Sequence, residues 1–115
     1  MKVLSLYKSL SDITRLRCVA LLITHGELCV CELTYALALP QPKISHHLAN
    51  LRKVKLVSDR KEGLWIYYQI NPDLPPWAIE TLKTMALGAR EEDLFIADET
   101  ALIEMPNRPT SAYCA

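Results

Sequence analysis

The sequence predicts a mainly α-helical domain that carries one β-hairpin. Two observations lead to this prediction. Most of the chain repeats its apolar residues every three or four positions, whereas residues 56–70 are rich in β-branched and aromatic residues around one Gly. A chain of 115 residues can form one domain with a modest core of its own. We expect residues 1–105 to form this domain and residues 106–115 to form a flexible tail.

The composition is that of an ordinary soluble protein, with 50% hydrophobic and 23% charged residues. No apolar run approaches the roughly 20 residues that a membrane span needs. The N-terminus also lacks the layout of a signal peptide. We therefore expect a cytoplasmic protein without membrane contact, whose 4 cysteines are reduced. In that setting, closely spaced cysteines favour metal-ligand or redox roles over structural disulfides.

Four helices are expected ahead of the hairpin. Ser11-Asp12 provides N-cap chemistry for the second helix, and Gly26 follows its end. Pro40 and Pro42 cannot lie inside a helix, but Pro42 suits the first turn of the next one. Residues 38–42 are therefore expected to form a tight turn between two short helices. The expected helices cover about residues 4–10, 13–24, 30–37 and 42–53.

The spacing of the apolar residues changes after the fourth expected helix. Strands are expected at residues 56–61 and 64–70 with Glu62-Gly63 between them, and the apolar spacing from Trp77 to about Phe95 predicts one long helix. Two helices joined by a tight turn and followed by a hairpin form a winged helix-turn-helix. The first and last helices are more apolar than a small monomer can cover, so we expect them to form the interface of a homodimer. The residues expected there are Leu4, Leu6, Tyr7, Trp77, Ile79, Leu82 and Met85.

The charges are distributed unevenly although the net charge is zero. Between Lys43 and Lys61 there are six basic residues and one acid, whereas residues 91–104 contain six acids and no base. A solvated surface would give similar charge runs, but the basic run coincides with the helix-turn-helix and favours double-stranded DNA as the partner. The side chains expected to contact DNA are Gln41, Lys43, Ser45, His46 and Asn50 on the fourth helix, and Arg60 and Lys61 on the wing.

The segment Glu27-Leu-Cys-Val-Cys-Glu-Leu33 places two thiols one residue apart, just before the helix-turn-helix. Thiolates are soft ligands that suit As(III) and Sb(III). Residues i and i+2 of a helix point about 200° apart, but Cys29 is expected at the N-cap position, so binding of Cys29 and Cys31 to one ion is expected to distort the first helical turn. The helix N-terminus should also favour the thiolate form. The alternatives are two small buried hydrophobic residues or a pair that responds to oxidation.

Three stretches resemble the ArsR (arsenical-resistance repressor) family of winged-helix metalloregulators, and specifically its arsenite-sensing branch. They are Asp12-Ile-Thr-Arg-Leu-Arg17, the thiol segment, and Gln41-Pro-Lys-Ile-Ser-His-His-Leu48, followed by the wing Asp59-Arg-Lys-Glu-Gly-Leu-Trp-Ile-Tyr-Tyr68. The resemblance covers roughly residues 10–77. It implies a homodimeric repressor that leaves its operator when trivalent arsenic or antimony binds cysteine thiolates.

The sequence departs from the arsenite-site pattern at one position. The pattern has a third cysteine three residues after the second, where this chain has Thr34. A third ligand could come from Cys114, from Cys18 or from a small thiol such as glutathione, or the site could use two sulfurs. Cys18 lies in an apolar run and is expected in the core.

The histidines favour no further metal site. Zinc sensors of the family build a second site on the last long helix, which contains no His here. His25 is expected at a helix C-terminus, and of His46 and His47 one should face DNA while the other packs. The competing functions are a thiol-based redox-responsive repressor and a protein-interaction module that no longer binds DNA. An enzyme is not expected, because no catalytic constellation is present.

Overall fold

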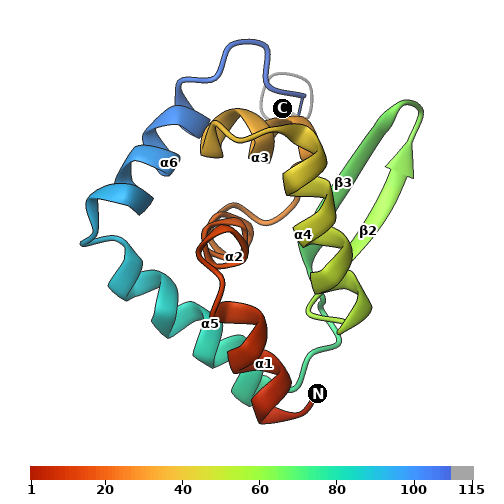
Figure 1. Ribbon diagram of the computed structural model, residues 1–115, viewed down its shortest axis with the longest axis vertical. Helices are drawn as coiled ribbons and strands as arrows, with labels where there is room; N and C mark the ends of the chain where they lie inside the picture. Colours follow the sequence, from red (N-terminus) through yellow and green to blue (C-terminus); the bar gives the residue numbers. More distant parts are fainter. Residues whose placement is uncertain (110–115) are drawn as a thin grey trace.

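The computed structural model describes residues 1–109. Within them, helices surround α2, and a small antiparallel sheet extends from one side (Figure 1). The elements are α1 Val3–Leu10, α2 Ile13–His25, β1 Leu28–Cys29, α3 Val30–Leu37, α4 Gln41–Lys53, β2 Val57–Glu62, β3 Trp65–Ile70, α5 Pro76–Ala89 and α6 Asp93–Ile103. This arrangement confirms the predicted winged helix-turn-helix, in which α3 and α4 form the helical pair and β2 and β3 form the wing.

The central helix α2 has the ends that its sequence predicts. The Asp12 side chain accepts a hydrogen bond from the Arg15 backbone N–H at 3.0 Å, and Gly26 ends the helix with a positive φ of 83°. The helix packs against α1, α4, α5, α6 and β3, so its apolar face forms the middle of the core. Leu22, Leu33 and Leu48 are fully buried there, and each such side chain stabilises the fold by about 1.5–3 kcal/mol.

A third strand, β1, joins the wing and was not predicted. Its residues pair with β3 in the register Leu28↔Tyr68 and Cys29↔Tyr67, and the strand order is β1-β3-β2. A strand of two residues has no periodicity to detect, so only its neighbours in space identify it. Because β1 ends where α3 begins, the wing is hydrogen-bonded to the start of the helix-turn-helix.

The prediction of one helix from Trp77 to Phe95 is wrong, because α5 ends at Ala89 and α6 begins at Asp93. Residues 91–93 are all acidic. Acidic side chains are unfavourable at the C-terminus of a helix and favourable at its N-terminus, so this run suits the start of α6 and not the end of α5. Gly88 further weakens the end of α5.

A buried ion pair holds α6 against the core. The Arg17 guanidinium donates to both carboxylate oxygens of Asp98 at 2.8 and 2.9 Å, and also to the Leu37 carbonyl at 3.1 Å. The hydrogen bond that Arg17 donates to Asp98 raises the pKa of Arg17. These contacts join α2, α3 and α6. The acidic segment of residues 91–104, most of which lies in α6, therefore belongs to the packed domain.

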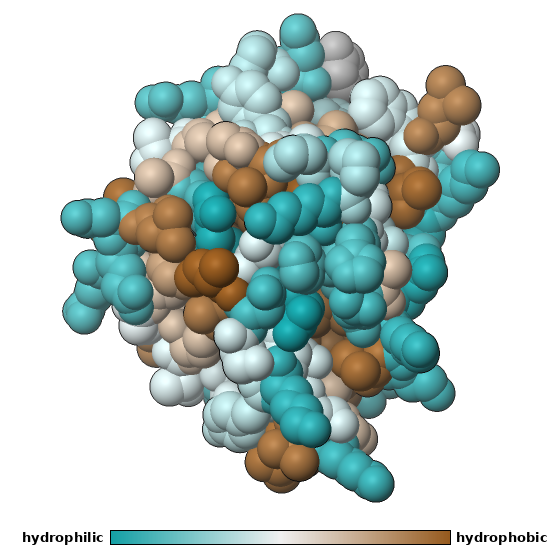
Figure 2. Space-filling view, viewed as in Figure 1, coloured by the Kyte–Doolittle hydropathy of each residue, from teal (hydrophilic) through white to brown (hydrophobic). Residues whose placement is uncertain are grey.

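The prediction of the dimer surface is wrong for two of its residues. Leu6 and Leu82 are fully buried in the core of their own chain, because they face α2 and its neighbours. Leu4, Tyr7 and Trp77 are exposed, whereas Ile79 and Met85 are half-buried. Figure 2 shows further hydrophobic side chains on the side formed by α5 and α6, where Leu87, Leu94, Ile96 and Ile103 are exposed. Among the described residues, none of the helices combines the length and apolarity that a bilayer crossing requires.

We expect Asp98→Ala to lower the free energy of unfolding by about 3–5 kcal/mol, because it leaves the buried Arg17 charge without its partner. Urea unfolding followed by circular dichroism measures this loss. Glu80→Ala is the matched control, since it removes an exposed ion pair with Lys83 at 3.7 Å and should cost less than about 1 kcal/mol. Equal losses in the two variants would contradict the proposed role of the Arg17–Asp98 pair.

Candidate functional site

Cys29 lies at the junction of two elements. It is the last residue of β1 and the N-cap of α3, with extended dihedral angles of φ −72° and ψ 151°. Its Sγ accepts a hydrogen bond from the Cys31 backbone N–H at 3.4 Å. The predicted N-cap position of Cys29 is therefore confirmed. Because Cys29 lies outside the helix, the separation of about 200° between the side chains of residues i and i+2 does not apply to this pair.

The two sulfurs already converge. The Cys31 thiol donates to Cys29 Sγ at an Sγ–Sγ distance of 2.9 Å. A metal–sulfur bond is about 2.3 Å for zinc, and two sulfurs on one such ion lie about 3 to 4 Å apart. Both sulfurs can therefore reach one ion from the positions that they already occupy. Cys29 is buried and Cys31 half-buried, so an ion has access on the Cys31 side.

The pKa of the Cys31 thiol is raised to about 12. Burial is the main cause, followed by the hydrogen bond that the thiol donates to Cys29 and by the nearby charge of Glu32. The prediction that the helix N-terminus favours the thiolate is wrong for Cys31, because these effects outweigh the helix dipole. At neutral pH this residue is a thiol.

Glu32 is a functional candidate that the sequence analysis missed. Its side chain is fully buried, yet both carboxylate oxygens have partners: Oε1 accepts from the Cys29 backbone N–H at 2.8 Å, and Oε2 accepts from Arg108 Nε at 2.7 Å. With the sulfur of Cys29 as the other member, this is a capping box. The spacing Cys29-x-x-Glu32 is the available signal, since it repeats the Ser/Thr-x-x-Glu pattern with a thiol in place of the hydroxyl.

The alternatives for a third ligand differ in position. Cys18 is fully buried in the core, as predicted, and burial raises its pKa to about 12. Cys114 lies outside the described residues. Thr34 Oγ1 is buried and has no hydrogen-bond partner among residues 1–109. In that part of the chain, no group of three or more His, Cys, Asp or Glu side chains forms a metal site, so the thiol pair is an incomplete site as far as the structure describes it.

The candidate DNA-contacting side chains of α4 lie on its outer face, opposite the buried Ile44, Leu48 and Leu51. Gln41, Lys43, His46 and Asn50 are exposed, and Ser45 is half-buried. Hydrogen bonds link Gln41 to Ser45 at 2.6 Å and Asn50 to His46 at 3.5 Å. Lys43 has no ion pair among residues 1–109. The outer face of the helix is therefore polar, and Lys43 contributes a positive charge to it.

The two adjacent histidines separate as predicted. His46 is exposed, whereas His47 is half-buried with Nδ1 at 3.7 Å from Asp12 Oδ2. Burial lowers the pKa of His47. His25 lies at the C-terminus of α2, also as predicted, with Nε2 at 2.7 Å from Glu99 Oε1.

Arg60 was expected to contact DNA, but in the structure its guanidinium is paired with two carboxylates. Its guanidinium donates to Glu27 at 2.7 and 2.8 Å and to Glu62, and it stacks on the Tyr67 ring at 4.5 Å. Hydrogen bonds with Glu27 and Glu62 raise its pKa. Because Glu27 is the first residue of the thiol segment, Arg60 joins the wing to that segment. Lys61 is exposed on the same strand.

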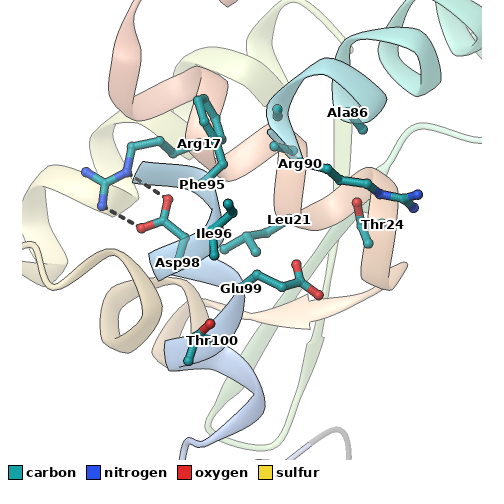
Figure 3. A pocket seen from close by; sticks show the side chains of 12 residues that line it. Arg17, Leu21, Thr24, Ala86, Arg90, Phe95, Ile96, Asp98, Glu99 and Thr100 are labelled. Atoms are coloured by element: carbon teal, nitrogen blue, oxygen red, sulfur yellow. Dashed lines mark hydrogen bonds and ion pairs between the residues drawn. The ribbon is translucent and has the colours of Figure 1, made fainter. Parts of the chain in front are cut away.

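A cavity of about 380 Å³ lies between α2, α5 and α6, and the sequence analysis did not predict it. Figure 3 shows Leu21, Phe95 and Ile96 on its apolar wall, with Arg90 and Glu99 beside them. The Arg17–Asp98 pair closes one side (Figure 3). No lining residue belongs to the thiol pair or to α4.

Comparisons with known proteins agree with the winged helix-turn-helix fold. Residues 12–59 match the family described as "Bacterial regulatory protein, arsR family". The arsenic resistance transcriptional regulator ArsR1 of Pseudomonas putida is 48% identical over 105 residues, which cover 91% of this chain and 80% of the relative. The arsenical resistance operon repressor of Escherichia coli is 51% identical over 79 residues, which cover 69% of this chain and 68% of the relative. The crystal structure of the antimony-specific transcriptional repressor AntR superimposes with a TM-score of 0.65 at 28% identity, covering 77% and 78%.

We expect alkylation of Cys31 by iodoacetamide to be slow at neutral pH and to accelerate about tenfold per pH unit, because only the thiolate reacts and its pKa is raised to about 12. Peptide mapping by mass spectrometry between pH 7 and 11 measures the rate. The same residue in urea is the control, since its rate should level off above the ordinary thiol pKa of 9.0. A folded-state rate that levels off at the same pH would contradict the raised pKa.

Proposed function

The chain belongs to the arsR family of bacterial regulatory proteins, and we propose that it is a repressor that As(III) or Sb(III) releases from operator DNA by binding Cys29 and Cys31. It is a transcriptional regulator and not an enzyme. The observation that carries the proposal is the convergence of two sulfurs at the first turn of α3. The names of the relatives, which refer to arsenic resistance and to antimony, support the class of effector.

The chemistry of arsenite suits a site in which Cys31 is a protonated thiol. Arsenous acid, As(OH)3, condenses with two thiols to form two As–S bonds, and each thiol proton leaves with a hydroxide as water. The reaction needs neither an oxidant nor a preformed thiolate, so the raised pKa of Cys31 does not oppose it. A redox switch, the alternative function, depends on thiolate character. The state of Cys31 therefore favours the metalloid effector over the oxidant.

The position of Cys29 supplies the coupling to DNA. Its backbone pairs with Tyr67 of the wing, and its sulfur caps α3, which packs against α4. When arsenic occupies both sulfurs, Cys29 Sγ no longer accepts the Cys31 N–H in the same way, and the first turn of α3 is reorganised. A coupling free energy of about 1–3 kcal/mol between the two sites changes affinity about 5- to 150-fold.

The DNA-binding surface in this proposal consists of the outer face of α4 and the wing. Gln41 and Asn50 can pair with base edges, while Lys43, Ser45, Lys61 and, once it exchanges its carboxylate partners, Arg60 suit phosphates. His46 lies beside them on the exposed face. Two copies of the chain, associated through the exposed residues of the terminal helices, would present two such surfaces to a palindromic operator.

We expect arsenite to release operator DNA from the wild type but not from Cys29→Ser or Cys31→Ser, because a hydroxyl replaces one sulfur of the pair. Fluorescence anisotropy of a labelled operator measures the release, and DNA affinity without arsenite should stay within about threefold, a change of less than 1 kcal/mol. Cys18→Ala is the control, since it removes a thiol that is sealed in the core. Release by peroxide with no response to arsenite would instead support the redox alternative.

We expect Lys43→Gln to weaken DNA binding and to reduce the slope of log affinity against log salt by about 1, because one phosphate contact is lost. Titrations at several salt concentrations give this slope. Lys83→Gln, on α5, removes another exposed lysine outside the proposed surface and is the matched control. Unchanged slopes in both variants would favour a protein-interaction module whose winged helix does not bind DNA.

A further inference from the structure

Thr34 has a buried hydroxyl that the packing of α3 does not use. Its Oγ1 is shielded from solvent and has no hydrogen-bond partner among residues 1–109. A threonine inside a helix can donate to the carbonyl four residues earlier, but Thr34 does not donate to Val30. Buried hydroxyls are usually hydrogen-bonded, because a hydroxyl without a partner loses its contacts with water and gains none in return. The unused hydroxyl therefore indicates a partner that binds from outside the chain.

Thr34 lies one helical turn after Cys31. Residues i and i+3 of a helix are neighbours on one face, with Cβ atoms roughly 5–6 Å apart. Each Cα–Cβ bond of a helix also leans towards the N-terminus, so Cβ of Thr34 leans over the turn that carries Cys31. Cys31 Sγ in turn contacts Cys29 Sγ at 2.9 Å. The unused hydroxyl therefore belongs to the side of α3 that carries the thiol pair.

The other polar side chains of α3 are already satisfied. Glu32 is fully buried, and its carboxylate oxygens accept from the Cys29 backbone N–H at 2.8 Å and from Arg108 Nε at 2.7 Å. Tyr35 is exposed, so water can bind its hydroxyl. Within α3, which the structure describes in full, Thr34 alone combines a buried polar atom with a free hydrogen-bonding capacity.

Arsenous acid leaves one group that this hydroxyl can bind. When As(OH)3 condenses with two thiols, two As–S bonds form, two waters leave and the third hydroxide stays on arsenic. That hydroxide and a threonine hydroxyl can each donate and accept a hydrogen bond. Arsenic prefers soft sulfur to a hard hydroxyl oxygen, so we do not expect Thr34 itself to become a ligand.

We propose that Thr34 Oγ1 forms a hydrogen bond with the hydroxide that As(III) retains on Cys29 and Cys31, and that this contact selects inorganic arsenite. The inference rests on the proposed function of the two cysteines. Arsenic stays trivalent throughout, so no oxidant or reductant is involved. An organoarsenical carries carbon in place of the third hydroxide and cannot form the contact. Thr34 is therefore a specificity-determining residue of the site.

The test compares two probes on the full-length reduced protein, in buffer without small thiols. Arsenite retains one hydroxide on two thiols, whereas hydrated phenylarsine oxide exchanges both of its hydroxides and retains its phenyl group. Thr34→Val removes the hydroxyl and keeps the shape of the side chain. We expect it to weaken arsenite binding about five- to tenfold, which is the effect of one hydrogen bond in a buried site. Its affinity for phenylarsine oxide should stay the same or rise.

Three further variants complete the series. Thr34→Ser keeps the hydroxyl and should bind arsenite nearly as the wild type does. Tyr35→Phe removes a hydroxyl from the exposed neighbouring position and is the matched control, for which we expect no change. Thr34→Cys places a third thiol at the position of the hydroxyl and should tighten arsenite binding. X-ray absorption at the arsenic edge should find two sulfurs and one oxygen around arsenic in the wild type, and three sulfurs in Thr34→Cys.

Urea unfolding separates this role from a structural one. Because the hydroxyl has no partner among residues 1–109, Thr34→Val should leave the free energy of unfolding unchanged or raise it. A clear loss of stability in Thr34→Val would mean that the fold itself uses the hydroxyl, and the inference would be overturned.

The remaining contrary outcomes are distinguishable from one another. Wild-type arsenite affinity in Thr34→Val, or three sulfurs around arsenic in the wild type, would overturn the inference while the proposed function stands, provided that Cys29→Ser and Cys31→Ser abolish binding. An equal loss for both probes in Thr34→Val would mean a disturbed thiol pair and would also overturn it. Absence of arsenite binding to the wild type would overturn the proposed function itself.

Discussion

The position of Cys29 outside α3, but within hydrogen-bonding distance of its first turn, is the constraint on which the site depends. Extended dihedral angles let the residue end a strand and cap a helix at once, and they direct its sulfur towards Cys31. Were Cys29 one residue further inside α3, the two side chains would point about 200° apart. The capping arrangement, and not the spacing alone, therefore turns two neighbouring cysteines into a pair.

The sequence predicted the parts of this protein that local rules determine. The ends of α2, the proline-led start of α4 and the glycine-containing wing follow from capping, proline geometry and turn chemistry, and all are observed. The contacts that complete the site join residues distant in the sequence: Cys29 with Tyr67, Glu27 with Arg60, and Glu32 with Arg108. No periodicity reports such contacts, so the sequence identified the thiols but not their surroundings.

Burial explains why the expectation of a lowered thiol pKa was wrong for Cys31. A helix N-terminus lowers a thiol pKa through partial positive charge, but here the carboxylate of Glu32 occupies that terminus and uses the Cys29 N–H. Burial and the Cys31-to-Cys29 hydrogen bond add to the shift in the same direction. The result is a pair of sulfurs that is close enough for one ion and in which Cys31 remains a thiol, which suits a reactant that carries its own hydroxides.

Two sets of contacts connect the thiol segment to both parts of the proposed DNA-binding surface. Through α3 the segment packs on α4, and through β1 and the Glu27–Arg60 pair it is joined to the wing. In the proposed mechanism, a change at Cys29 acts on both the recognition helix and the wing, because both are in contact with this segment. Because the ion would change both contacts with DNA together in this mechanism, a coupling free energy of only a few kcal/mol is sufficient to favour the DNA-free state.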